Sequence, residues 1–331
     1  MHLASRRGPR NFVVCVMALA VVSAVPQAAG AVSASRQRAL EGSSYVVGQQ
    51  RANGSICAFS CIGSTADAVT ALVAARTAPG VVKDALAYLR RQIERGHVTG
   101  LGLRAKVAMA AEAGGANPRA FGGLNLVRAI TDVEGVDGRY GDAAVFDQAF
   151  AMLALQGAGT DPSADAESWL EAAQCDDGGW QYDAPPSASD DAHCFDSSIP
   201  DPGDFFTSDS NTTSLAIQVL QTGTDVDEAL AFLPTLRDGT AGWGYSQGYP
   251  TDVNSTALVI QAYVAAGTAV PAGGFATLRT SQLDCGAWPY QPGGGDDIGA
   301  TIGAILGILR QPLPVPPLSA TRPVPSMPPC A

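Results

Sequence analysis

Residues 281–307 read SQLDCGAWPYQPGGGDDIGATIGAILG, and this stretch decides the fold. It holds the end of one helix, a short turn of the pattern Gln282-x-x-x-Gly286-x-Trp288, and a second helix that opens at Asp297. The second helix is apolar nearly all round, so protein or membrane must surround it. It is too short to span a bilayer. We therefore predict that it is the inner helix of a helical repeat.

The same turn recurs upstream, and such recurrence is typical of repeat architectures. Gln174-x-x-x-Gly178-x-Trp180 is a second full match, and a degenerate third copy ends in Trp243. Three weaker copies keep the spacing and lose the tryptophan. The last positions of the six turns are Ile56, Val98, Tyr140, Trp180, Trp243 and Trp288. Their near-regular spacing indicates six copies of one unit.

Each turn is followed by an apolar segment rich in small residues. These segments are expected to begin near Asp67, Arg104, Asp147, Asp209, Asp252 and Asp297. Six outer–inner helix pairs can close into a ring, with the inner helices around a central cavity. The sequence therefore predicts an all-α fold, an (α/α)6 toroid of six helical hairpins.

The repeated turn resembles the QW motif of squalene and terpene cyclases, over roughly residues 36–311. The whole pattern is similar to the α/α-toroid superfamily of terpenoid cyclases and protein prenyltransferase β-subunits. Cobalamin carriers of the intrinsic-factor type share that toroid. The resemblance implies a hydrophobic or corrinoid-like small molecule in the central cavity. It does not fix an activity, because function belongs to sites and not to folds.

The two ends of the chain differ from the repeats. Residues 1–31 are typical of a secretory signal peptide, with a basic start, a short apolar core and small residues at Ala29–Ala31. The toroid domain is assigned to 32–311, with an insert loop at 181–208. The Pro-rich tail, 312–331, is expected to be extended and largely unpacked. It has no apolar anchor, so we predict an extracellular protein with no stable membrane span after signal removal.

Charge and cysteine content narrow the function classes. Removing the three arginines of the signal takes the formal net charge from −11 to −14, which disfavours a nucleic-acid partner. Six cysteines remain, and in an exported chain an even number suggests disulfides. The preferred pairs are Cys57–Cys61, Cys175–Cys194 and Cys285–Cys330, although 15 connectivities are possible. Histidines at zinc-ligand spacing are missing, so we expect neither a metal nor a cofactor.

Polar residues at the inner-helix starts form the candidate site. An aspartate there accepts backbone N–H bonds and complements the helix dipole, which by itself would lower its pKa. If the helix starts ring one end of the cavity, the same residues face a ligand. The candidate ligand-binding residues are Asp147, Asp209, Asn211, Asp252, Asn254 and Asp297, with the turn tryptophans Trp180, Trp243 and Trp288. For the tryptophans, packing within the turn is the alternative role.

The catalytic plans that the resemblance implies are incomplete. Class II terpene cyclases use an Asp-x-Asp-Asp cluster at an inner-helix start, whereas this chain has Asp209-Ser210-Asn211-Thr212. Prenyltransferases need zinc held by Asp, Cys and His, and the His is missing. The leading hypothesis is therefore ligand binding without catalysis. The alternatives are an active terpene cyclase or prenyltransferase with a divergent acid, and a structural or interaction toroid with a filled centre.

Overall fold

The computed structural model describes residues 33–183, 207–239 and 241–330. Ser33–Ala331 forms one compact unit. Its inner helices are α2 (Cys61–Ala74), α4 (Leu101–Ala113), α6 (Val145–Gly157), α8 (Ser210–Leu220), α10 (Val253–Ala265) and α12 (Ile298–Leu309). Its outer helices are α1 (Ala34–Gly48), α3 (Pro79–Glu94), α5 (Leu126–Thr131), α7 (Ala164–Ala172), α9 (Thr224–Phe232) and α11 (Gly274–Ser281). Smaller elements are η1 (Pro118–Ala120), η2 (Leu233–Leu236) and the antiparallel pair β1 (Trp288–Pro289) and β2 (Asp296–Asp297).

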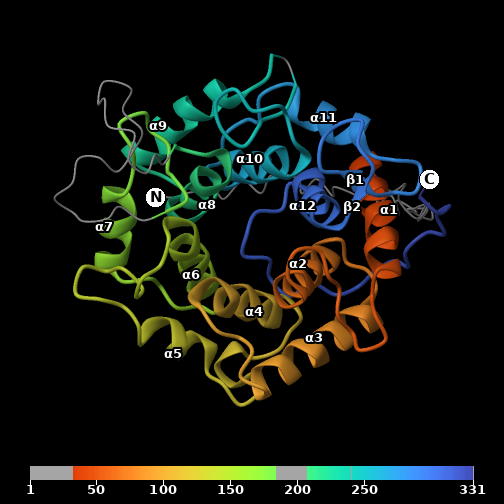
Figure 1. The fold of residues 1–331 in the computed structure, drawn as a ribbon, viewed down its shortest axis with the longest axis horizontal. Helices are drawn as coiled ribbons and strands as arrows, with labels where there is room; N and C mark the ends of the chain where they lie inside the picture. Colours follow the sequence, from red (N-terminus) through yellow and green to blue (C-terminus); the bar gives the residue numbers. More distant parts are fainter. Residues whose placement is uncertain (1–32, 184–206, 240, 331) are drawn as a thin grey trace, which may run out of the picture. The chain divides into compact units, whose positions relative to one another are not determined.

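The inner helices form a closed ring. Each packs on its neighbours, and α12 packs on α2, so the last repeat meets the first. Figure 1 shows the six inner helices around the centre and the outer helices outside them. Helix α1 completes the outer layer by packing on α12. The predicted (α/α)6 toroid is confirmed.

Local sequence explains where most helices begin. One inner helix begins earlier in the chain than predicted. The helix expected near Asp67 begins at Cys61 instead. The reason is Ser60, whose hydroxyl accepts the Gly63 N–H at 3.3 Å and so caps the helix one turn and a half earlier. The other five inner helices begin within three residues of their predicted starts.

The glutamine of the two full copies of the turn ties one repeat to the next. Gln174 Nε2 donates to the Gly178 carbonyl at 2.8 Å and to the Asp225 carbonyl of α9 at 2.7 Å. Gln282 makes the equivalent pair with Gly286 and with Arg38 of α1, both at 2.9 Å. In both turns one side-chain amide therefore bridges the carbonyl of its own turn and a carbonyl of the next outer helix. The last turn therefore closes the ring through hydrogen bonds to the first outer helix.

Two features of the full turns require glycine: its backbone conformation, and the lack of room for a Cβ. Gly178 has φ +83° and Gly286 φ +87°, in the left-handed region. A Cβ on Gly286 would lie 2.4 Å from the Glu41 carbonyl oxygen of α1. This close approach brings the next outer helix onto the turn, which explains why the repeat keeps glycine here.

Two of the three predicted disulfides are present among the described residues. Cys57–Cys61 and Cys285–Cys330 are bonded. Cys175 is also disulfide-bonded, and its predicted partner Cys194 lies outside the described residues. The predicted signal peptide and most of the insert loop lie outside them too. No described helix is long and apolar enough to cross a membrane.

The tail after α12 is extended, as predicted, and most of its described residues are exposed or partly exposed, but it is packed against the ring at several points. The Leu313 N–H donates to Gln218 Oε1 of α8 at 2.8 Å, and Val315 is buried. Further on, the Thr321 N–H donates to the Arg76 carbonyl at 2.8 Å. Figure 1 shows this segment crossing the middle of the ring. The tail packs because the open end of the barrel offers apolar surface and unpaired polar groups that its residues satisfy.

Candidate functional site

A cavity of about 150 Å³ lies inside the ring. Residues of α2, α4, α6, α10 and α12 line its walls, and Leu313 of the tail contributes to its lining. The apolar lining is Met109, Phe146, Phe150, Leu258, Ile302, Leu306 and Leu313, and the polar lining is Asp67, Thr70, Lys106, Asn254 and Gln261. Gly299 and Gly303 of α12 leave room for it.

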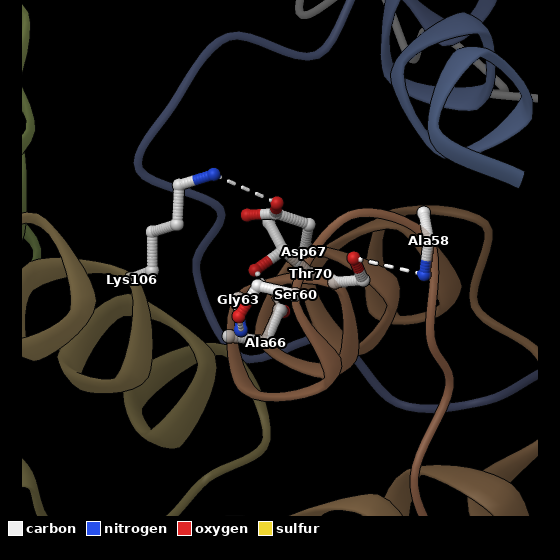
Figure 2. Close-up of polar contacts among 8 residues, drawn as sticks. Ala58, Ser60, Gly63, Ala66, Asp67, Thr70 and Lys106 are labelled. Atoms are coloured by element: carbon white, nitrogen blue, oxygen red, sulfur yellow. Dashed lines mark hydrogen bonds and ion pairs between the residues drawn. The ribbon is translucent and has the colours of Figure 1, made fainter. Parts of the chain in front are cut away.

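An ion pair between adjacent inner helices is part of this lining. Lys106 Nζ of α4 lies 2.9 Å from Asp67 Oδ2 of α2, and the two side chains point toward one another in Figure 2. The ammonium also lies 5.0 Å from the centre of the Phe150 ring of α6. A carboxylate and an aromatic face both attract a cation. Three neighbouring inner helices are thus linked through one lysine.

Asp147 lies near the Lys106 ammonium, and it does not cap a helix. Helix α6 is preceded by Ala144, and no side chain caps it. The Asp147 carboxylate instead lies against Gly102 of α4, where a Cβ would be 2.2 Å from Oδ1. Partial burial raises the pKa of Asp147, and the nearby Lys106 ammonium opposes that rise. Asp147 is therefore a carboxylate that local structure leaves available for a ligand.

The other three candidate aspartates are helix caps. Asp209 accepts the N–H groups of Asn211 and Thr212 at 2.9 and 2.8 Å, and the Thr212 hydroxyl at 2.8 Å. Asp252 caps α10 through the Ser255 N–H, and Asp297 caps α12 through the Ala300 N–H, both at 2.7 Å. These bonds occupy the carboxylates with their own helices.

The expectation that capping would lower the pKa of such a group was wrong for Asp252. Burial raises the pKa of Asp252, although its bonds to Ser255 and Asn254 act in the opposite direction. In Asp209, which has no exposed surface, burial raises the pKa to about 6 against the bonds from Thr212, Asn211 and the Tyr245 hydroxyl. Removal from water penalises the charged form more than the caps stabilise it.

Tyrosines two residues after the turn tryptophans join neighbouring inner-helix starts. The Tyr182 carbonyl accepts the Phe146 N–H of α6 at 3.3 Å, and the Tyr245 carbonyl accepts the Ser210 N–H of α8 at 2.8 Å. Tyr290 does the same for Val253 of α10 at 2.9 Å. Tyr182 also stacks on Phe146, with ring centres 5.2 Å apart. These rings therefore lie at the N-terminal end of the barrel, the same end as the aspartates.

The three turn tryptophans are placed for packing. Trp180, Trp243 and Trp288 have no exposed surface. Trp180 Nε1 donates to the Leu170 carbonyl at 2.7 Å, and Trp288 Nε1 to the Leu278 carbonyl at 2.6 Å. The prediction that they contact a ligand is not supported, because they fill the space between the inner and outer layers.

One buried acceptor in the cavity lacks a partner. Gln156, Gln218 and Gln261 each follow an inner-helix aspartate by nine residues, yet they have different partners. Gln156 Nε2 donates to the Val219 carbonyl at 3.1 Å, and its Oε1, which does not line the cavity, also lacks a partner among the described residues. Gln218 Oε1 holds the tail. Gln261 is 1% exposed and lines the cavity, and its Oε1 has no hydrogen-bond partner among the described residues. A buried unpaired acceptor is costly and indicates a missing donor.

The comparisons with known proteins agree on architecture. No family model and no curated protein matches the sequence. Among solved structures, the type II terpene cyclase MstE from Scytonema aligns with a TM-score of 0.56 at 13% identity, covering 83% of this chain and 97% of the cyclase. An inactive variant of the α-1,6-mannanase GH76A of Salegentibacter sp., in complex with α-1,6-mannotriose, gives 0.54 at 11%, with 83% and 97% covered. A protein from Actinoplanes gives 0.56 at 14%, with 83% and 98% covered.

The chain is an α/α toroid. At this level of identity the likeness establishes the fold, and the terpene cyclase and the mannanase share it with different substrates. The activity of this toroid therefore has to be argued from its own cavity.

Sequence reasoning found part of the toroid's site and missed the rest. Asp147 and Asn254 were predicted, and the structure places Asn254 in the cavity lining and Asp147 beside its lysine. Asn211 lies at the start of α8, and its Oδ1 is buried without a partner. The missed residues are Asp67, Lys106, Phe146, Phe150 and Gln261. A signal existed for Lys106, because it is one of only two lysines after the predicted signal peptide and it lies within an inner-helix segment.

Proposed function

We propose that this protein is an exported toroid that binds a small, partly apolar molecule in its central cavity without catalysis. The unpartnered Gln261 Oε1 carries the proposal. It is buried among Leu258, Ile302 and Leu306 in the cavity lining, where a ligand that donates a hydrogen bond would satisfy it. The apolar side chains would then contact the body of that ligand.

The size of the cavity limits the ligand. Small-molecule sites are usually about 300–1,000 Å³, and an empty apolar cavity of about 150 Å³ suits one ring of benzene size. The cavity here is about 150 Å³. We therefore favour a single-ring hydrophobic group over an enclosed corrinoid. A larger ligand would extend from the cavity across the aspartates and tyrosines at the N-terminal end of the barrel.

Charge limits the ligand as well. Asp147, Asp209, Asp252 and Asp297 lie at or beside the inner-helix starts, and Lys106 is engaged by Asp67. A diphosphate brought there would be repelled by the carboxylates. This supports a neutral or cationic ligand, and it opposes turnover of a prenyl diphosphate.

We also propose that the protein does not catalyse terpene cyclisation. Alkene protonation needs a strong acid whose proton is available to the substrate. Asp209 accepts from two backbone N–H groups and two hydroxyls and has no exposed surface. We expect no product from squalene, oxidosqualene or a prenyl diphosphate, with or without magnesium. A cyclic product lost in Asp209→Asn would overturn this expectation.

Native mass spectrometry of protein purified from its secretion medium tests the binding proposal. We expect an adduct that denaturation releases. Gly303→Leu, which places a side chain into the cavity, should abolish the adduct. Gly295→Leu is the matched control, because a Cβ there meets no atom within 4 Å. An adduct that survives in Gly303→Leu, or no adduct in the wild-type protein, would favour the structural toroid instead.

Asp147 supports a second candidate function, turnover of a ligand at the N-terminal end. Its pKa is raised by burial, and it is free of capping duties. Carboxylates with raised pKa are used as general acids. Incubation with α-1,6-mannan oligosaccharides and with terpene substrates, comparing wild type and Asp147→Asn, decides the question. Product formation that Asp147→Asn abolishes would establish an enzyme, and no product from either protein would leave the binding function.

A further inference from the structure

A second hollow lies outside the ring. It is about 500 Å³ and is lined by α3, by the C-terminal end of α4 and by Pro317–Ala320 of the tail. This volume is within the usual range for small-molecule sites, and it is about three times that of the central cavity. We call it the α3–tail groove.

One face of α3 forms the wall of the groove. Pro79, Val82, Lys83, Leu86, Ala87 and Arg90 line it, at the spacing that places residues on one side of a helix. Val82 is buried and Leu86 half-buried, whereas Lys83 and Arg90 are exposed. Across the groove, Leu318 adds apolar surface from the tail. The groove thus combines an apolar base with two cations.

These cations have no carboxylate partner in the described part of the chain. The ion pairs found there are Asp67–Lys106 and Arg128–Asp132. Arg90 instead lies over the Phe121 ring, 5.2 Å from its centre. None of the described residues that line the groove is acidic. In a protein with a formal charge of −11, an unneutralised basic groove is a local exception.

More positive charge lies beyond the Thr77 end of the groove. The Thr77 hydroxyl donates to the Arg322 carbonyl at 2.8 Å, and Arg36 Nη2 donates to the Thr321 hydroxyl at 3.4 Å. Burial, and then the charges of Arg76 and Arg322, lower the pKa of Arg36. Three guanidinium groups therefore gather where the tail meets α1 and α2, and their mutual repulsion would be relieved by an anion.

We propose that the α3–tail groove binds a free amphipathic carboxylate, with its apolar chain along Val82, Leu86 and Leu318 and its carboxylate attracted by Lys83 and Arg90. The apolar base favours an amphipathic molecule over a simple anion, and the cations favour it over a neutral apolar molecule. This site is independent of the central cavity, whose carboxylates favour the opposite charge.

A free molecule fits the groove better than a membrane surface. The large hydrophobic side chains exposed among the described residues are Phe59, Val133, Val136, Tyr182, Tyr249 and Tyr290. None of them lines the groove. Membrane binding needs apolar side chains that protrude into the lipid, whereas here the apolar residues lie at the base of a hollow.

Isothermal titration calorimetry with sodium decanoate tests the proposal on the full secreted chain. We expect saturable binding of decanoate, with weaker binding of 1-decanol and of decyltrimethylammonium. Lys83→Gln and Arg90→Gln should each weaken decanoate binding about two- to fivefold, as removal of one exposed ion pair predicts. The matched control is Arg128→Gln, an exposed arginine of α5 outside the groove. Gly303→Leu, in the central cavity, should leave decanoate binding unchanged.

Several results would overturn the proposal. Equal affinity for decanoate and 1-decanol would remove the role of the cations. Unchanged affinity in both Lys83→Gln and Arg90→Gln would place the site elsewhere, as would loss of binding in Gly303→Leu. Tight association with phosphatidylglycerol vesicles, without saturable decanoate binding, would replace the free carboxylate by a membrane.

Discussion

The two halves of the barrel use acidic residues differently. In the second half, α8, α10 and α12 each begin directly after an aspartate that caps them. In the first half, α2 is capped by Ser60, and α4 and α6 have no side-chain cap. The aspartates there lie inside the helices, where Asp67 pairs with Lys106 and Asp147 lies near it. A shift of a few residues along a helix changes the partner of an aspartate from its own backbone to a neighbouring helix or a ligand.

The capping aspartates of the second half and the non-capping aspartates of the first half should differ in their effect on stability. A capping aspartate satisfies donors that folding leaves unpaired, so its removal weakens the fold. Asp147, beside the lysine of the cavity, loses hydration without gaining such bonds, so it lowers stability in its charged form. The second half should therefore maintain the ring, and the first half should determine what the cavity accepts.

The largest effect should come from the pH dependence of the buried cap. The folded-state pKa of Asp209 is about 6, above its unfolded value, so the carboxyl favours folding when protonated. This contribution is complete below about pH 4 and is lost as pH rises through about 6, by up to about 3 kcal/mol. Urea unfolding from pH 4 to pH 7 should show this loss in wild type and less of it in Asp209→Asn. If the free energy of unfolding had the same pH dependence in both proteins, the raised pKa of Asp209 would be contradicted.

The second effect compares the two classes of aspartate at constant pH. Asp252→Ala should lower the free energy of unfolding by about 1–2 kcal/mol, because it leaves the start of α10 uncapped. Asp147→Asn should leave that free energy unchanged or raise it, because it removes a carboxylate whose charge burial disfavours. Urea denaturation at pH 7 measures both. Equal destabilisation by the two changes would mean that Asp147 also has a structural role.

The smallest effect on stability concerns the lysine that links the first half. Lys106→Met should change the free energy of unfolding by less than about 1 kcal/mol, because the pair with Asp67 is partly exposed. It should nevertheless raise the pKa of Asp147 further, since the ammonium now opposes the effect of burial. Carbon-detected NMR titration of the aspartate carboxyls measures that shift. Arg128→Gln serves as a control. An unchanged Asp147 pKa in Lys106→Met would show that the Lys106 ammonium does not act on the Asp147 carboxylate.

The sequence by itself determined the repeat and therefore the ring. In the two full copies of the turn, the glycine has positive φ and admits the next outer helix, and the glutamine reaches two backbone carbonyls. These are local demands at fixed spacing, so they are visible in the chain. The apolar inner helices and the capping aspartates follow from the same local rules. The two disulfides found among the described residues match the preferred pairs, but the sequence alone left 15 connectivities open.

Only the tertiary structure decided what fills and surrounds the centre. The contacts of Lys106 with Asp67 and Phe150 join three inner helices. No spacing in the sequence encodes the angles between these helices, so the contacts could not be predicted. Three glutamines at one register position differ in what their Oε1 atoms meet: the tail reaches Gln218, whereas Oε1 of Gln156 and of Gln261 has no partner among the described residues. The tail itself looked unpacked because its prolines form no regular element. It packs because closing the ring creates an apolar opening that only a segment from outside the repeats can cover.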